Sequence, residues 1–214
     1  KPSKGSNVSR YADGLVELTV QALENIRYQD APPLAMDQKV ITLSRRLPDE
    51  ARLAWADQLL AKMKGRRPKS RPEVYAEQAR FINDNPTEKL VLQTLRIGDL
   101  GITTLPNEVY SITGLKLKAR SPFPATFNVE LANGAAGYIP PPHQHELGGY
   151  TTWPARTAGL EVDAEPKIVE TLLSSLESLA EKPRRDPAPF PGPYAKAILD
   201  EKPLAYWRCE EFEG

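Results

Sequence analysis

Two segments of this sequence carry side chains that could do chemistry next to a predicted strand. The first ends in Leu105-Pro106-Asn107-Glu108, which places the Glu108 carboxylate where the strand gives way to a turn. Ligands and catalytic groups gather at the carboxyl ends of strands in α/β sheets, so Glu108 is a candidate site residue. The alternative interpretation is structural, because a carboxylate near a helix N-terminus is stabilised by the helix dipole by ~0.3–1 kcal/mol.

The second segment, residues 133–140, follows another predicted strand and is rich in glycine and alanine. Small residues let a backbone or a ligand approach closely, and they leave Tyr138 at the rim of any pocket there. Tyr150 follows Gly148-Gly149, which indicates a tight turn that presents its hydroxyl. For both tyrosines the alternative is a loop residue whose ring packs and whose hydroxyl is solvated.

The triplet His143-Gln144-His145 is a further candidate, because alternate residues of an extended segment face the same way. A catalytic zinc takes three protein ligands, so two histidines favour a surface or hydrogen-bonded pair over a metal site. No phosphate loop, dinucleotide fingerprint, GxSxG elbow or HExxH motif is present. We interpret three basic pairs as solvated surface residues: Arg45-Arg46, Arg66-Arg67 and Arg184-Arg185.

The elements that must position these residues are helices and strands in alternation. Apolar spacing predicts helices over 9–28, 48–64, 72–82, 109–119 and 164–181, and strands over 35–45, 89–97, 100–105 and 126–132. In the last helix a buried stripe is formed by Ile168, Leu172, Leu173, Leu176 and Leu179. Gly98-Asp99 suits a type II′ hairpin between two of the strands. The predicted fold class is α/β, with strands 89–97, 100–105 and 126–132 in one mixed sheet flanked by helices.

Composition narrows the classes of function. The chain has 214 residues, of which 28 are basic and 28 acidic, and the zero net charge argues against a nucleic-acid or membrane-surface partner. Its apolar stretches are shorter than the ~20 residues of a membrane span. The single cysteine, Cys209, excludes an internal disulfide framework and a thiolate-rich metal site. The 21 prolines are about twice the common ~5% usage and indicate rigid loops and linkers.

Taken together, these segments resemble the later part of the catalytic domain of the neutral/alkaline (non-lysosomal) ceramidase family, best between residues 89 and 160. The resemblance is carried by Thr104-Leu105-Pro106-Asn107-Glu108, Gly114, Leu131-Ala132-Asn133, Ala136-Gly137-Tyr138-Ile139 and Gly149-Tyr150. In that family a strand ends in a Pro-Gly-Glu turn whose Glu binds zinc, and Asn107 stands here in place of the glycine. A later Tyr also contacts the zinc, and a second Tyr twelve residues on lines the site, which is the spacing of Tyr138 and Tyr150.

The resemblance implies that Glu108 and Tyr138 are zinc ligands and that Tyr150 is a polar catalytic residue. In the family a serine attacks an amide whose carbonyl the zinc polarises, and Tyr150 would donate a hydrogen bond to the oxyanion. That serine and two zinc histidines precede the matching segment, so this sequence would hold half a site. We therefore expect the chain alone to be inactive and without tight zinc binding, because two oxygen ligands make a poor site.

The expected function is that of a fragment of a zinc-dependent amidohydrolase acting on the N-acyl amide bond of a sphingolipid-like substrate. The resemblance also implies a secreted or other extracytoplasmic location. The alternative is a non-enzymatic surface scaffold, or a carbohydrate-binding or adhesion protein, that retains the fold. An upstream segment with two histidines and a serine loop would favour the enzyme.

The chain is interpreted as a piece of a longer protein with three parts. Residues 1–181 are assigned to the ceramidase-like catalytic domain, and residues 182–193 form a linker with five prolines. Residues 194–214 resemble the truncated start of a laminin-G or concanavalin-like lectin domain, a segment too short to fold alone. A carbohydrate partner is the expectation attached to that segment.

Overall fold

The computed structural model describes residues 7–186 and 200–202. It divides into two compact units, Lys1–Pro32 and Pro33–Gly214. The first unit contains helix α1 (Asn7–Glu24), which agrees with the predicted helix and buries none of its own side chains. No helix in the described part of the chain is long and apolar enough to cross a membrane.

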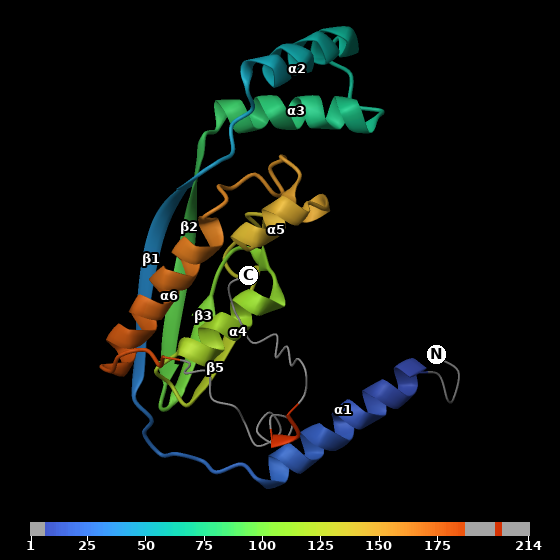
Figure 1. Cartoon of the computed structure of the whole chain (residues 1–214). Helices are drawn as coiled ribbons and strands as arrows, with labels where there is room; N and C mark the ends of the chain where they lie inside the picture. The colour runs from blue at the N-terminus through green and yellow to red at the C-terminus, as the bar shows by residue number, and fades with distance from the viewer. Residues whose placement is uncertain (1–6, 187–199, 203–214) are drawn as a thin grey trace. The chain divides into compact units, whose positions relative to one another are not determined.

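The second unit is built on a four-stranded sheet with the order β1-β2-β3-β5 (Figure 1). The strands are β1 (Leu34–Ser44), β2 (Thr87–Ile97), β3 (Leu100–Thr104) and β5 (Ala125–Val129). β1, β2 and β3 are antiparallel neighbours, and β5 runs parallel to β3. Gly98, with φ of 60°, makes the turn between β2 and β3 that its position predicts. The mixed α/β fold is therefore confirmed.

Helices α4 (Ser111–Arg120) and α6 (Ala164–Ala180) pack on the sheet and form the main core (Figure 1). The predicted stripe of α6 is confirmed, because Ile168, Leu172, Leu173 and Leu176 are buried against strand residues such as Leu90 and Leu92. One ion pair lies inside this layer: Lys116 Nζ is 3.2 Å from the fully buried Glu165 carboxylate, which also accepts a hydrogen bond from Thr113.

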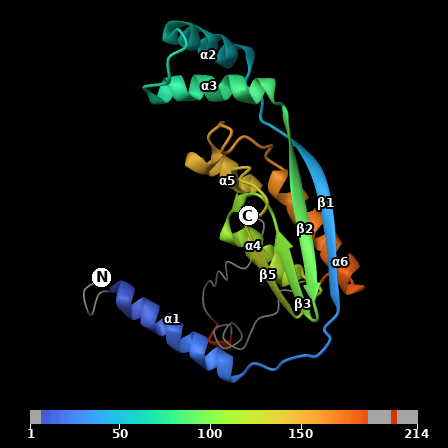
Figure 2. The same ribbon diagram turned by 180° about the vertical axis from the view of Figure 1, so that it is seen from behind.

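Helices α2 (Glu50–Met63) and α3 (Arg71–Asp84) pair with each other through a smaller core of alanines (Figure 2). Asp49 caps α2 by accepting a hydrogen bond from the Arg52 amide, as its position before the helix favours. Small side chains at the contact let the two helices approach closely.

Two predicted elements differ from the structure. Val109 does not start a helix but lies in the short strand β4 (Glu108–Val109), which pairs in parallel with β6 (Tyr138–Ile139). The strand predicted over 126–132 ends at Val129, because Leu131 takes up the left-handed conformation with φ of 54°. Its apolar residues do alternate, yet they face outward: Phe127 is 44% exposed.

The interpretation of the basic pairs as solvated surface is wrong for Arg45-Arg46 and for Arg184. Arg45 is buried against Phe81 and pairs with Glu88, and Arg46 donates hydrogen bonds to three carbonyl oxygens. Arg184 pairs with Glu170 and Glu177, while Arg185 donates to the Ser121 carbonyl of the segment after α4. Arg66-Arg67 and Arg185 are exposed as expected, with Arg66 bonded to Glu73.

The predicted linker 182–193 is described only as far as residue 186, and of the predicted lectin-like segment 194–214 only residues 200–202 are described. Both remain predictions, as does the assignment of residues 1–181 to one catalytic domain.

Candidate functional site

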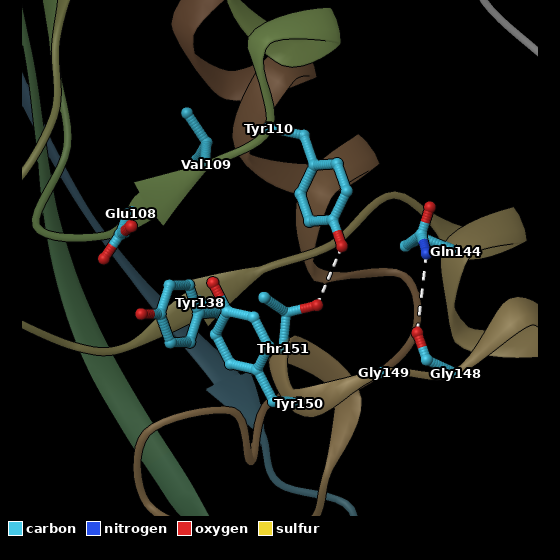
Figure 3. Close-up of a pocket in the computed structure, with 9 residues that line it drawn as sticks. All are labelled: Glu108, Val109, Tyr110, Tyr138, Gln144, Gly148, Gly149, Tyr150 and Thr151. Carbon is cyan, nitrogen blue, oxygen red and sulfur yellow. Dashed lines mark hydrogen bonds between the residues drawn. The ribbon is translucent and has the colours of Figure 1, made fainter.

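The strand pair β4–β6 brings the first two predicted site residues together. Glu108 and Tyr138 are register partners, so their side chains leave the same face of this two-stranded sheet. The next pair, Val109 and Ile139, joins the hydrophobic core instead. Glu108 is exposed and Tyr138 is half-buried, and both line a pocket of about 400 Å³ (Figure 3).

Main-chain hydrogen bonds fix the two segments that carry these residues. The amides of Leu131 and Ala136 donate to the carbonyls of Asn107 and Pro106, and the Glu108 amide donates to Gly137 at 3.1 Å. Sequence positions some thirty residues apart are thereby bonded backbone to backbone, so the site has a rigid base.

Gly137 is required where the chain enters β6. Its φ is 85°, and a Cβ placed there would lie 2.4 Å from the Thr157 carbonyl oxygen. That same oxygen accepts a 2.8 Å hydrogen bond from the Tyr138 amide. The prediction that small residues permit a close approach before Tyr138 is confirmed at this position.

Tyr150 lies in the same pocket, at the start of the 3-10 turn η1 (Tyr150–Thr152). Its ring meets the Tyr138 ring edge-on, with centroids 5.4 Å apart and an interplanar angle of 87°. Gly148 and Gly149 have φ of 76° and 100°, which makes the tight turn predicted before Tyr150. All three predicted site residues therefore line one pocket, with Tyr150 62% exposed.

The far side of the pocket contains polar groups that the sequence did not single out. Tyr110 and Thr151 share a 2.7 Å hydrogen bond between their hydroxyl oxygens, and the Gln144 amide donates to the Gly148 carbonyl (Figure 3). Gln144 comes from α5 (Pro142–Leu147), a segment predicted as a loop. Proline at the first helical turn and glycine after the last are the sequence signals that would have found this helix.

The helical conformation of α5 also contradicts the extended geometry assumed for the histidine pair. Residues two apart on a helix do not face the same way. His143 is exposed, whereas His145 is half-buried near Arg46, and both burial and that cation lower the pKa of His145. The two histidines do not form a pair of ligands.

Arg46 holds the loop that carries Tyr150. Its guanidinium donates to the carbonyl oxygens of Thr152, Ala158 and Leu160 at 2.6–3.1 Å. Loop carbonyls left without partners are costly when buried, and a planar donor such as guanidinium can satisfy several at once. Arg46 thus ties the loop over residues 149–161 to the end of β1.

Asn107 is another residue whose role the sequence does not show. It is fully buried, and its side-chain amide donates to the Gly137 carbonyl at 3.4 Å. Glu130 acts nearby by accepting a hydrogen bond from the Val109 amide. Both residues brace the β4–β6 pair from outside the pocket.

The electrostatics of the pocket follow from the proximity of Glu108. Its negative charge raises the pKa of the Tyr138 hydroxyl, with desolvation and the neighbouring Tyr150 adding to the shift. A raised pKa keeps the Tyr138 proton in place at neutral pH, so Tyr138 presents a neutral hydroxyl beside the Glu108 side chain.

The donors fit one side of a zinc site and do not complete it. Carboxylate and phenol oxygens are both acceptable zinc ligands, but structural and catalytic sites use three or four protein ligands. Within residues 7–186 and 200–202, no group of three His, Cys, Asp or Glu side chains could hold a metal ion. Among the described residues that line this pocket, Glu108 is the one carboxylate.

Comparisons with known proteins give only a partial likeness. No protein-family model and no curated protein matches this sequence. Among solved structures, a ceramidase complexed with C2 is 17% identical over 47% of this chain and 16% of its own, with a TM-score of 0.39. The neutral ceramidase from Pseudomonas aeruginosa is 14% identical over 72% of this chain and 30% of its own, with a TM-score of 0.38. This chain thus spans less than a third of either of these ceramidases.

Proposed function

We propose that this pocket is one part of the active site of a zinc-dependent amide hydrolase of the neutral-ceramidase type. The substrate would be the N-acyl amide bond of a sphingolipid or a similar lipid amide. The observation that supports the proposal is the register pairing of Glu108 with Tyr138, with Tyr150 edge-on beside them in the same pocket. If the Glu108 and Tyr138 side chains left opposite faces of the β4–β6 pair, they could not bind one metal ion, and the proposal would fail.

Each residue has a role that its position permits. Glu108 supplies an anionic oxygen and Tyr138 a neutral one, on the same face of the β4–β6 pair. When bound there, zinc would polarise the carbonyl of an amide substrate. Tyr150, whose ring is fixed against Tyr138, would donate its hydroxyl proton in a hydrogen bond to the oxygen that becomes negative during attack.

The remaining ligands and the nucleophile would come from residues outside this sequence. This accords with the donor count, because two oxygen ligands bind zinc weakly by themselves. The chain alone would be inactive, and the complete enzyme would act in an extracytoplasmic compartment.

The test is a Zn²⁺ titration of the 214-residue chain followed by amide resonances in ¹H–¹⁵N NMR spectra. We expect weak binding that shifts the resonances of Glu108, Tyr138 and Tyr150, and we expect these shifts to disappear in Glu108→Gln. Glu146→Gln is the matched control, because Glu146 is an exposed carboxylate on α5 that does not line the pocket.

Shifts that persist in Glu108→Gln, or that map away from the pocket, would contradict the proposal. So would hydrolysis of an N-acyl amide by this chain that survives Glu108→Ala. Shifts of the first kind would favour the alternative of a non-enzymatic scaffold that retains the fold, whereas surviving hydrolysis would place the catalytic residues elsewhere in the chain.

A further inference from the structure

The four-stranded sheet has one covered face and one open face. The cross-strand row that contains Thr94 and Thr103 points toward α4 and α6, as does every second row on either side of it. The rows between them point the other way. We call the exposed or half-buried part of the outward set the open face: Leu34, Met36, Gln38, Val40 and Thr42; Lys89, Val91, Gln93, Leu95 and Ile97; Leu100 and Ile102; Ala125, Phe127 and Val129. Thr104 has the same orientation but is buried, so it is not part of this face.

The open face has the composition of a protein interior. Ten of its side chains are Leu, Ile, Val, Met or Phe, yet Leu34 is 73% and Val40 56% exposed. Lys89, at one end of β2, is its only charged side chain. Contiguous apolar surface of this kind marks an interaction site in a folded protein.

The central polar groups of the face, Gln38 and Gln93, are joined to each other by a hydrogen bond. The Gln93 amide donates to the Gln38 side-chain oxygen at 2.7 Å, and the Gln93 oxygen accepts hydrogen bonds from Asn133 and Thr104. Because these hydrogen bonds already exist, covering this network costs less than burying unpaired polar atoms.

We propose that the open face is a dimer interface at which a second copy of this chain packs, sheet against sheet. A two-fold axis would lay the face on itself, as in isologous dimers, with the layers about 10 Å apart. The face suits its own copy because it has no acidic side chain, and the lone Lys89 lies at its end rather than in its centre. A nucleic acid or an anionic membrane would need a basic surface, which this face lacks.

The size of the face is that of a small, weak interface. β1 and β2 have 11 residues each, and β3 and β5 have 5 each. At ~3.3 Å per residue and ~4.8 Å between strands, that is roughly 500 Å² of flat sheet per copy. Two copies would bury about 1,000 Å², near the lower bound for specific interfaces, so the dimer should dissociate on dilution.

The experiment is sedimentation velocity of the 214-residue chain over a wide range of concentrations. We expect a monomer–dimer equilibrium whose dissociation constant rises by about tenfold or more in Val40→Lys, because each dimer would then bury two unpaired charges. Phe127→Lys, on the opposite edge strand, should act in the same way. Val74→Lys is the matched control, since Val74 is an exposed valine on α3 and should leave the equilibrium unchanged.

Circular dichroism of each variant would show that the fold is kept, and the two edge-strand variants give independent tests if one does not fold. A wild-type chain that stays monomeric at every concentration would overturn the proposal. A dimer that persists in both Val40→Lys and Phe127→Lys, or that is lost in Val74→Lys, would overturn it too. Glu108, Tyr138 and Tyr150 are not on this face, so none of these outcomes bears on the proposed hydrolase site.

Discussion

Substitution of Gly137 tests whether a close backbone contact positions the candidate site. Gly137→Ala places a methyl group 2.4 Å from the Thr157 carbonyl oxygen, at a position whose φ is 85°. This methyl group would meet backbone atoms rather than a flexible side chain, so the segment around Gly137 must shift. We expect a large loss of stability and displacement of Tyr138.

The expected loss of stability has two contributions, the strained backbone conformation and the weakened hydrogen bonds. A left-handed φ costs an L-residue ~1–2 kcal/mol, which is partly offset by ~0.4–1 kcal/mol from reduced freedom of the unfolded chain. The steric clash then weakens the bonds from the Tyr138 amide to Thr157 (2.8 Å) and from the Glu108 amide to Gly137 (3.1 Å). At about 1 kcal/mol for each bond, the total loss is about 3 kcal/mol.

Gly65→Ala is the matched control for this experiment. Gly65 has φ of 77°, nearly that of Gly137, but nothing lies within 4 Å of its hypothetical Cβ. Only the conformational cost applies there, so the expected loss is about 1 kcal/mol. Urea denaturation of the two variants and the wild type measures both values, and the difference isolates the contact with Thr157.

Equal losses in the two variants would refute this reasoning, because they would mean that the close approach of Gly137 to Thr157 does not constrain the fold. NMR spectra give a second readout. In Gly137→Ala the resonances of Tyr138 and Tyr150 should shift, whereas in Gly65→Ala they should not.

Three further substitutions test other contacts. Lys116→Met leaves the buried Glu165 carboxylate without its cation and should cost about 3 kcal/mol in urea denaturation, whereas adding Glu165→Leu should recover part of that loss. Arg46→Ala removes three hydrogen bonds to loop carbonyls, so it should cost about 3 kcal/mol and increase amide hydrogen exchange over residues 152–160. Arg66 lowers the pKa of Glu73 to about 2, so its stabilisation is full above the unfolded value of about 4.5 and is lost as the pH falls toward 2. Thermal unfolding at a series of pH values measures this difference. Glu73→Gln should be less stable than the wild type near pH 7, and the two should become equally stable as the pH falls through 2. A difference in stability that does not change with pH would contradict this.

The regular elements could be predicted from the sequence because their signals are local. Alternation along β2 and the leucine stripe of α6 each reflect a single buried face, and the Asp49 cap and the Gly98 turn mark ends. The three site residues were reached differently, through turn chemistry and a resemblance in motif spacing. Tyr138 and Tyr150 lie side by side because α5 and the turn at Gly148-Gly149 return the chain to β6.

What the sequence could not predict depends on contacts between distant segments. Arg46 looks like a surface arginine until the loop over residues 152–160 folds across it with unpaired carbonyls. Asn107 looks like a turn residue until its backbone and side chain bond the loop before Tyr138. The outward face of β5 has the alternation of a buried strand, because alternation shows that two faces differ and does not show which one is covered.

In this pocket, stability and the proposed chemistry depend on different atoms. The backbone at Glu108 and Tyr138 is held by main-chain hydrogen bonds and by the core residues Val109 and Ile139. The Glu108 and Tyr150 side chains themselves are exposed, so replacing them should change stability by less than about 0.5 kcal/mol. A loss of zinc-induced shifts in Glu108→Gln would therefore report on the missing carboxylate rather than on a damaged fold. Gly137→Ala should do the reverse, because it leaves every polar side chain in place and moves the backbone that holds them.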